Sequence, residues 1–357
     1  MELGIIEGFY GRPWSWPART ETIVALSRQG YRWHLYAPKA DHALRSGWRN
    51  SLTADWLANV SAHQSACQQH GVSFGVGLSL QAFDRNSPAD RSHLHARLRQ
   101  LDELRIESIA VLFDDPIDRS ATSPEEQSAL VMEIAAASSA ARLWVCPTWY
   151  ADDGLLDQIY GARPHNYLSR LCQSLDPSIG VFWAGSKICA DGYGPDELDR
   201  VAAQMHRLPT LWDNYPVNDG PLMSPYLHLS PARARHPAVL NSRIAAHFVN
   251  PALQPVLTRI PAIALAQQYR GPVTTDPAVQ FMGAACEVMD DVLARQLLRD
   301  LNDLETRGLP KLDEELADKN ILRETYRSFE HLAAAEIVAW LDGCWTEPSL
   351  SVDTQLT

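Results

Sequence analysis

The sequence contains no run of about 18 apolar residues that could span a bilayer, and basic side chains are few. Its 357 residues include 31 Lys and Arg against 43 Asp and Glu, which gives a formal net charge of −12. This charge repels phosphate backbones and acidic polysaccharides at long range and argues against nucleic acid as a partner. With 46% hydrophobic residues, the composition predicts a soluble globular protein without a membrane partner.

Cysteine pairs and ligand clusters are also missing from the sequence. The six cysteines are scattered without a CxxC pair, and no histidine cluster shows the spacing of metal ligands. This argues against a disulfide framework and a zinc site, and it predicts reduced core thiols in a cytoplasmic protein with neither a metal nor a cofactor. No basic segment followed by an apolar one precedes Glu7, so we expect no export signal.

Short apolar runs alternate with amphipathic stretches over the first 270 or so residues, a pattern that predicts alternating strands and helices. The predicted strands are Leu3–Glu7, Tyr31–Tyr36, Val72–Leu78, Ser108–Phe113, Arg142–Cys146, Gly180–Trp183, Pro209–Trp212 and Ile244–Val249. Helices are predicted at Pro17–Gln29, Ala54–His70, Pro88–Arg105, from Pro124 onward, His165–Leu175, Glu197–Arg207 and Ala252–Tyr269. The seventh helix, near Pro231–Pro237, is predicted to be short or missing.

Eight strand-helix units of this length predict an α/β fold of the TIM (β/α)8 barrel type over residues 1–272. A doubly wound open sheet is the alternative arrangement. Its usual phosphate-binding GxGxxG motif is not found, because Gly75-x-Gly77 lies inside the third predicted strand and lacks the third glycine. We therefore expect the closed barrel.

The pattern changes beyond Asp276, where the amphipathic segments Pro277–Arg307 and Lys311–Trp345 flank Gly308-Leu309-Pro310. They predict a C-terminal helical region over residues 273–346, followed by a disordered tail at 347–357. We expect the two helices to pack on the barrel as a hairpin. A contact between two copies of the chain in a homodimer and a wall of a substrate groove are the alternatives.

Polar and aromatic residues follow most of the predicted strands, at the end of the barrel where the active sites of this fold lie. The candidates for a binding pocket are Gly8, Tyr10, Lys39, Tyr150, Trp212, Asn214, Asp219 and Asn250. Such a set is typical of a pocket for a hydroxyl-rich ligand, and a sugar is the natural candidate. Taken singly, the lysine could lie at the surface, the aromatic residues in the core, and the asparagines and aspartate in turns.

Asp114-Asp115, directly after the fourth predicted strand, is the candidate reaction centre. Both side chains can face one ligand if the backbone leaves the sheet there, as Pro116 favours. Two neighbouring carboxyl groups hold protons with different affinities, and glycoside hydrolysis uses a proton donor together with a second carboxylate. The alternative interpretation is a pair of acids in a turn or helix cap.

The ordered set of motifs resembles glycoside hydrolase family 84, the O-GlcNAcase family of β-N-acetylglucosaminidases, over about residues 3–270. The resemblance depends on Glu7-Gly8-Phe9-Tyr10-Gly11-Arg12-Pro13-Trp14, Tyr36-Ala37-Pro38-Lys39, Phe113-Asp114-Asp115, Cys146-Pro147-Thr148-x-Tyr150, Trp212-Asp213-Asn214, Asn218-Asp219 and Asn250-Pro251. One motif departs from the family. After the third strand the family usually has Ser-Pro-Gly, whereas this chain has Ser79-Leu80-Gln81, which leaves the preference for the aglycone open.

The resemblance implies a retaining mechanism in which the 2-acetamido oxygen of the substrate attacks the anomeric carbon and forms an oxazoline. It implies that Asp114 orients the amide and that Asp115 is the general acid and then the general base. By the same resemblance Gly8 and Lys39 contact sugar hydroxyls, and Tyr150 and Asn214 hold the acetamido group. Trp212 walls the pocket, while Asp219 and Asn250 bind further hydroxyls.

The expected function is therefore that of an exo-acting β-N-acetylglucosaminidase acting on a terminal β-linked N-acetylglucosamine of a glycoside or glycoprotein. A hyaluronidase-like endo-hydrolase is one alternative, and the acidic net charge argues against its polyanionic substrate. A non-catalytic N-acetylglucosamine-binding protein is the other alternative. Binding alone does not require a proton donor, so the presence of both Asp114 and Asp115 argues against it.

Overall fold

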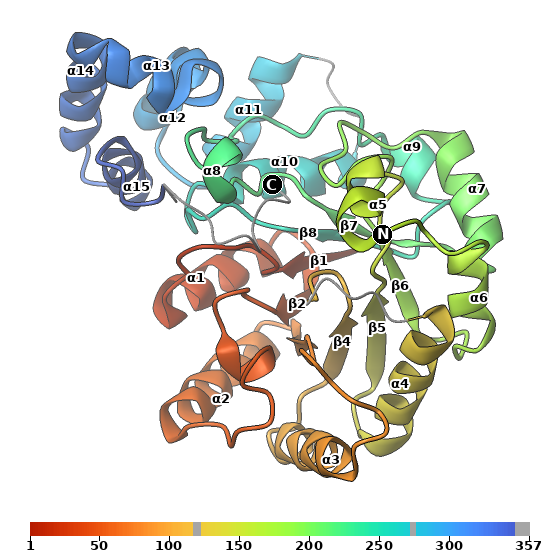
Figure 1. Cartoon of the computed structure of the whole chain (residues 1–357). Helices are drawn as coiled ribbons and strands as arrows, with labels where there is room; N and C mark the ends of the chain where they lie inside the picture. Colours follow the sequence, from red (N-terminus) through yellow and green to blue (C-terminus); the bar gives the residue numbers. More distant parts are fainter. Residues whose placement is uncertain (117–122, 272–275, 347–357) are drawn as a thin grey trace.

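The computed structural model describes residues 1–116, 123–271 and 276–346. Parallel strands follow one another in sequence order and close into a barrel, with β1 paired to β8, and helices surround it (Figure 1). This confirms the predicted TIM barrel. The strands are β1 (Glu2–Ile6), β2 (Tyr31–Tyr36), β3 (Ser73–Leu78), β4 (Ser108–Leu112), β5 (Arg142–Cys146), β6 (Gly180–Trp183), β7 (Thr210–Asp213) and β8 (Ala246–Val249).

The helices around and beyond the barrel alternate with these strands and then continue alone to the end of the described chain. Those of the barrel are α1 (Trp16–Ser27), η1 (His42–Leu44), α2 (Ala54–Gln69), α3 (Pro88–Glu103), α4 (Pro124–Ala137), α5 (Gly154–Tyr160), α6 (Tyr167–Gln173), α7 (Pro195–Met205), α8 (Gly220–Met223), α9 (Pro237–Leu240) and α10 (Arg259–Arg270). Those beyond it are α11 (Pro277–Ala285), α12 (Asp291–Leu301), the π-helical turn η2 (Asn302–Arg307), α13 (Gly308–Glu314), α14 (Leu316–Arg327) and α15 (Leu332–Leu341). Among the described residues, no helix is both long and apolar enough to cross a membrane.

Large aromatic rings fill part of the barrel interior. Trp144 packs edge-on against Trp33 and Phe248. Glycines on neighbouring strands make room for these rings, since a Cβ on Gly180 would lie 2.3 Å from Trp144 and one on Gly4 would lie 2.4 Å from Phe248. The interior is therefore a packed core, and the hollow of the barrel that can hold a ligand lies at its end.

The predicted start of the last barrel helix needs correction. The last barrel helix was expected to begin at Ala252, but α10 begins at Arg259. The residues between use their backbone amides elsewhere: Ala252 N–H donates to Thr258, and Val256 N–H donates to Glu336. The seventh crossover holds only the four-residue helices α8 and α9, as the sequence predicts.

The C-terminal region contains more and shorter helices than the two predicted. Asp290 and His331 end the continuous pattern, because their side chains accept backbone N–H groups and start α12 and α15. Gly308-Leu309-Pro310 was expected to separate two helices, yet it forms the beginning of α13. A Cβ on Gly308 would lie 2.4 Å from Tyr226, so glycine lets the chain approach the barrel here. The predicted tail at 347–357 lies outside the described residues.

Two half-buried glutamates attach the C-terminal helices to the barrel, where α12–α15 gather on one side (Figure 1). Glu305 accepts hydrogen bonds from the amides of Leu229 and Ser230, both at 2.6 Å, and from the Ser230 hydroxyl. Glu336 accepts them from Val256 and Leu257. These contacts place the helical region directly against the connections that follow β7 and β8.

Glu336 should make stability depend on pH. Burial raises its pKa to about 7, against the opposing effect of the backbone donors. A raised pKa in the folded state means that the stabilising contribution is full below about pH 4.5 and is lost as the pH rises through about 7.

We expect the native protein to lose about 3 kcal/mol of unfolding free energy over this range relative to Glu336→Gln. Urea unfolding at several pH values measures this, with the exposed Glu330→Gln as control. Parallel curves for all three proteins would contradict it.

Candidate active site

The candidate binding residues meet in one pocket at the carboxyl ends of the strands. The pocket is lined by Gly8, Tyr10, Lys39, Asp114, Asp115, Cys146, Tyr150, Ile188, Trp212, Asn214, Asp219 and Asn250. Ten of these twelve are the residues singled out in the sequence. Cys146 and Ile188 were missed as lining residues. Cys146 ends β5, and apolar side chains of this kind give no separate signal in the sequence.

Lys39 lies between the two neighbouring acids at the centre of the pocket. Its Nζ donates to Asp114 Oδ2 and lies 2.6 Å from Asp115 Oδ2. All three side chains are buried to nine-tenths or more. The second oxygen of the first acid, Asp114 Oδ1, is buried and has no hydrogen-bond partner among the described residues. The pocket therefore holds a buried acceptor that a ligand donor can satisfy.

The two carboxyl groups differ in proton affinity. Burial raises the pKa of Asp114, and the Lys39 cation offsets this only in part. Burial acts on Asp115 in the same direction, but the cations of Lys39 and Arg45 together outweigh it and lower the pKa of Asp115. Burial favours the neutral amine of Lys39, yet the two carboxylates raise its pKa. In the ligand-free pocket, Lys39 therefore keeps Asp115 ionised.

Three side chains fix the backbone that carries the two acids. After β4, consecutive carbonyl groups accept hydrogen bonds from three different elements: Phe113 from the Thr148 hydroxyl at 2.9 Å, Asp114 from the Tyr160 hydroxyl at 2.7 Å, and Asp115 from the Gln81 amide at 2.8 Å. This is how the chain leaves the sheet with both carboxylates facing the pocket.

Sequence reasoning missed Tyr160 and assigned no role to Gln81. Tyr160 lies at the end of α5, far along the chain from the acids that it supports. Gln81 lies in the Ser79-Leu80-Gln81 segment that departs from the family pattern, and its amide also donates to Ser79 Oγ. Gln81 therefore helps to hold the backbone of Asp115, the general-acid candidate. Neither spacing nor composition indicates this role.

The opposite wall of the pocket is a chain of amide hydrogen bonds. Asn250 accepts from the Gly8 amide at 3.1 Å and donates to Asn214 at 2.9 Å. Asn214 also accepts from the Trp212 indole at 2.9 Å, while the Tyr10 amide donates to Asp219 at 2.6 Å. A Cβ on Gly8 would lie 2.1 Å from the Trp212 ring, so only glycine lets the backbone pass this close to the indole.

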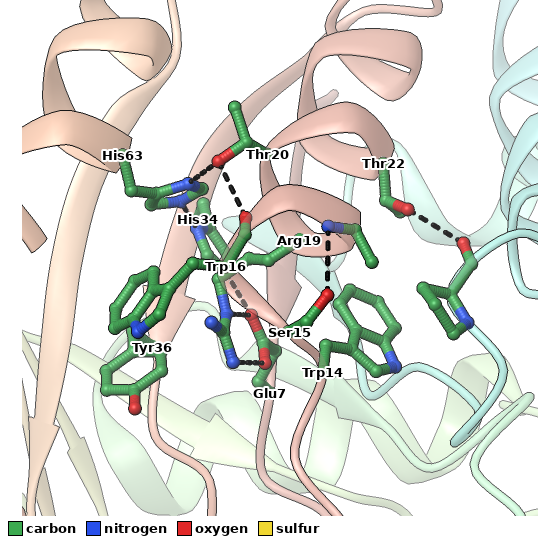
Figure 2. A network of polar contacts seen from close by, with 12 residues as sticks. Glu7, Trp14, Ser15, Trp16, Arg19, Thr20, Thr22, His34, Tyr36 and His63 are labelled. Atoms are coloured by element: carbon green, nitrogen blue, oxygen red, sulfur yellow. Dashed lines mark hydrogen bonds and ion pairs between the residues drawn. The ribbon is translucent and has the colours of Figure 1, made fainter. Parts of the chain in front are cut away.

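Two buried carboxylates with similar surroundings hold the strand ends that form this wall. Glu7, next to Gly8, accepts two hydrogen bonds from Arg19 (Figure 2). Its Oε1 also lies 2.8 Å from Nε2 of His34 on β2. The arginine and histidine help to lower the pKa of Glu7 to about 2, against the effect of burial.

Asp213, next to Asn214, has the same kind of partners at the end of β7, which β8 separates from β1. It pairs with Arg235 through both oxygens and with His247 on β8. Each carboxylate is thus linked to the neighbouring strand and to a following segment of the chain. We call each set of three residues, Glu7 with Arg19 and His34 and Asp213 with Arg235 and His247, a carboxylate clamp. The carboxylate of each clamp directly precedes a pocket residue, Gly8 or Asn214.

The chain is similar to known proteins in sequence and in fold. Residues 3–302 match the sequence profile of a family described as beta-N-acetylglucosaminidase. Curated relatives named Protein O-GlcNAcase, from Rattus norvegicus and Mus musculus, are each 27% identical over 227 residues, which are 60% of this chain. That match spans only 24% of the length of each relative.

Solved structures show the same fold. An O-GlcNAc hydrolase variant from Thermobaculum terrenum superposes with a TM-score of 0.77 and 24% sequence identity, covering 95% of this chain and 80% of the other. This likeness concerns the fold alone. The profile match covers most of the described barrel and the pocket, and the chain therefore belongs to the beta-N-acetylglucosaminidase family.

Proposed function

We propose that this protein is a retaining exo-β-N-acetylglucosaminidase that uses the 2-acetamido group of its substrate as the nucleophile. The observation that carries the proposal is the buried Asp114 Oδ1, which has no hydrogen-bond partner among the described residues and lies beside Asp115 in a pocket lined by polar and aromatic side chains.

In the first step, Asp114 accepts the amide N–H of the acetamido group and holds its carbonyl oxygen beside the anomeric carbon. That oxygen bonds to the anomeric carbon while the glycosidic bond breaks, and Asp115 gives its proton to the departing oxygen. The Asp114 carboxylate stabilises the positive charge of the oxazolinium. Neighbouring acids suit this reaction, since the attacking atom comes from the ligand and no protein nucleophile is required.

In the second step, Asp115 takes a proton from a water molecule whose oxygen bonds to the anomeric carbon. The bond from the acetamido oxygen breaks, and the sugar leaves with its original configuration. Tyr150, which lines the pocket beside both acids, would contact the acetamido group, and Asn250 and Asp219 would contact hydroxyls.

Lys39 links substrate binding to the proton affinity of the acid. In the ligand-free pocket the Lys39 cation favours the ionised form of Asp115. A sugar hydroxyl that takes over the hydrogen bond of Lys39 weakens this effect, and the pKa of Asp115 rises because burial is then opposed less strongly. Substrate binding thus raises the pKa of Asp115 and favours the protonated form that a general acid needs.

Release of nitrophenol tests the proposed function. We expect the purified protein to hydrolyse 4-nitrophenyl N-acetyl-β-glucosaminide and to leave the corresponding β-glucoside intact, because the glucoside lacks the acetamido nucleophile. Equal turnover of the two substrates would remove the acetamide from the mechanism. Calorimetric binding of N-acetylglucosamine without turnover of either substrate would instead support a sugar-binding protein. Cytoplasmic location and a homodimer through the C-terminal helices stay predictions.

A further inference from the structure

A cluster of metal-binding side chains lies outside the active-site pocket, between β2 and the helices that cover it. His34 belongs to β2, and His63 and Cys67 lie one turn apart on α2. All three residues are buried, with 0%, 2% and 1% of their surfaces exposed. One ligand atom from each lies within 4.8 Å of the others. The sequence gives no sign of this cluster, because the strand and the helix bring its members together.

The spacing of these atoms is close to what a small cation requires. His34 Nδ1 lies 2.9 Å from His63 Nε2, and Cys67 Sγ lies 3.4 Å from the same nitrogen. Metal-nitrogen bonds of about 2.0 Å and metal-sulfur bonds of about 2.3 Å separate neighbouring ligand atoms by about 3.3–3.7 Å. The cluster must therefore open by about half an ångström to hold a cation.

The far nitrogens of both histidines already have the partners that metal-bound histidines need. His34 Nε2 lies 2.8 Å from Glu7, which Arg19 helps to keep ionised, so this nitrogen donates a proton. His63 Nδ1 lies 2.8 Å from Thr20 Oγ1 (Figure 2). When one ring nitrogen of a histidine donates to a carboxylate or another oxygen, the ring is fixed in orientation. Its other nitrogen is then a better metal ligand.

The contacts of Thr20 decide whether His63 Nε2 can bind a cation. Thr20 Oγ1 donates to the carbonyl of Trp16 at 2.9 Å, so it accepts from His63 Nδ1. Both neutral rings then direct lone pairs at each other across 2.9 Å. Without a cation, the hydroxyl of Thr20 must turn to His63 so that one ring can donate to the other.

From this geometry we infer that His34, His63 and Cys67 form a binding site for a soft d10 cation, with Cu⁺ preferred over Zn²⁺. Two imidazole nitrogens and a thiolate are ligands that such cations share. Binding releases the Cys67 proton to solvent, and the thiolate then cancels the single charge of Cu⁺. Zn²⁺ would leave one uncompensated charge in a buried site, which is costly. Cu⁺ also accepts three ligands, the number that this cluster supplies.

The surroundings of the cluster are consistent with a dry site for a soft ion. Phe74 lies edge-on to His63, with ring centroids 5.1 Å apart, and Trp16 lies at 5.8 Å from the same ring. Thr20 and Trp16 on α1 are only partly buried, so the site lies one layer of side chains below the surface. Parting α1 from α2 is the route by which a cation would enter.

Competition for Cu⁺ under anaerobic conditions tests the site with the full-length chain. We expect the native protein to retain one Cu⁺ per chain against bathocuproine disulfonate, and Cys67→Ser to bind at least 100-fold more weakly. Cys286→Ser is the matched control, because Cys286 is exposed and outside the cluster. X-ray absorption of the loaded native protein should show a three-coordinate ion with one sulfur ligand.

Two results would overturn the inference. Equal retention of Cu⁺ by the native protein and Cys67→Ser would show that the cluster is not the site. Tighter binding of Zn²⁺ than of Cu⁺ through the same residues would contradict the argument from charge. Metal-free near-ultraviolet circular dichroism checks that Cys67→Ser is folded, and His63→Gln provides a second variant that removes a ligand from the same helix. None of these measurements uses the proposed hydrolase activity, so the two proposals can fail separately.

Discussion

With Asp115 replaced by alanine, turnover of N-acetylglucosaminides with poor leaving groups is expected to fall about 100- to 10,000-fold, because the departing oxygen loses its proton donor. Nitrophenyl substrates should lose far less in the first step, since nitrophenolate leaves without protonation. Asp114→Ala should be slow on every substrate, because the acetamido group is then neither oriented nor stabilised. Steady-state kinetics over a series of leaving groups of graded pKa measures the difference.

The comparison includes a matched control. Asp191→Ala removes an exposed aspartate whose ion pair with Lys187 lies at the surface, and it should leave the kinetics unchanged. Identical dependence on the leaving group in Asp114→Ala and Asp115→Ala would refute the separate roles. The Lys39 contact predicts one more detail. Because Lys39 lowers the pKa of Asp115 before substrate binds, and a general acid must be protonated, the free enzyme and its substrate complex should show different alkaline limbs in their pH profiles.

Arg235→Met is expected to destabilise the protein by about 3–5 kcal/mol, the largest effect on stability that we predict. Arg235 holds both oxygens of Asp213 and donates to the carbonyls of Ala190 and Asp191. Its removal leaves the Asp213 carboxylate buried beside His247 alone. Guanidinium unfolding measures the loss, and kcat/KM should fall as well because the clamp fixes Asn214.

The neighbouring arginine provides the control for this experiment. Arg233 is exposed, so Arg233→Met should change stability by no more than about 0.5 kcal/mol. The double variant Asp213→Leu, Arg235→Met removes both charges and should recover part of the stability lost in the single variant. Equal stability of the two single arginine variants would show that the clamp around Asp213 contributes little.

The pocket could be predicted from the sequence because its residues follow strands. In a parallel barrel every strand ends at the same rim, so an order of strands, even with boundaries wrong by one or two residues, is enough to bring Lys39, Asp114 and Asn250 together. Leu3–Glu7 was predicted for β1 and Glu2–Ile6 is observed, yet Gly8 lies in the pocket in either case.

The supports of the pocket could not be predicted in this way. Tyr160 and Gln81 reach the carbonyls of Asp114 and Asp115 from elements whose separation in space is set by helix packing. Arg19 and Arg235 become partners of buried carboxylates only once the helices and loops are in place. Tertiary hydrogen bonds of this type leave no periodic pattern in the sequence.

The number of C-terminal helices was wrong for a related reason. The apolar residues keep a helical period through the whole region, since each short helix turns its apolar side to the same body. Asp290 and His331 interrupt it because their side chains accept hydrogen bonds from backbone amides, Asp290 from Val292 and Leu293 and His331 from Ala333. A helix cap of this kind ends one helix and starts the next, although the apolar periodicity of the sequence continues across it.

The loop that carries Asp219 has its outer side braced by the C-terminal helices. The Leu227 amide donates to Leu304, the Leu309 amide donates to Pro225, and the Trp340 indole donates to Ser224. The boundary near residue 272, between the barrel and the C-terminal helices, therefore divides the sequence pattern but does not separate two independent structural units. A barrel taken from this protein as a scaffold for engineered glycosidases should keep α12–α15, since the barrel alone would lack the support of the loop that carries Asp219.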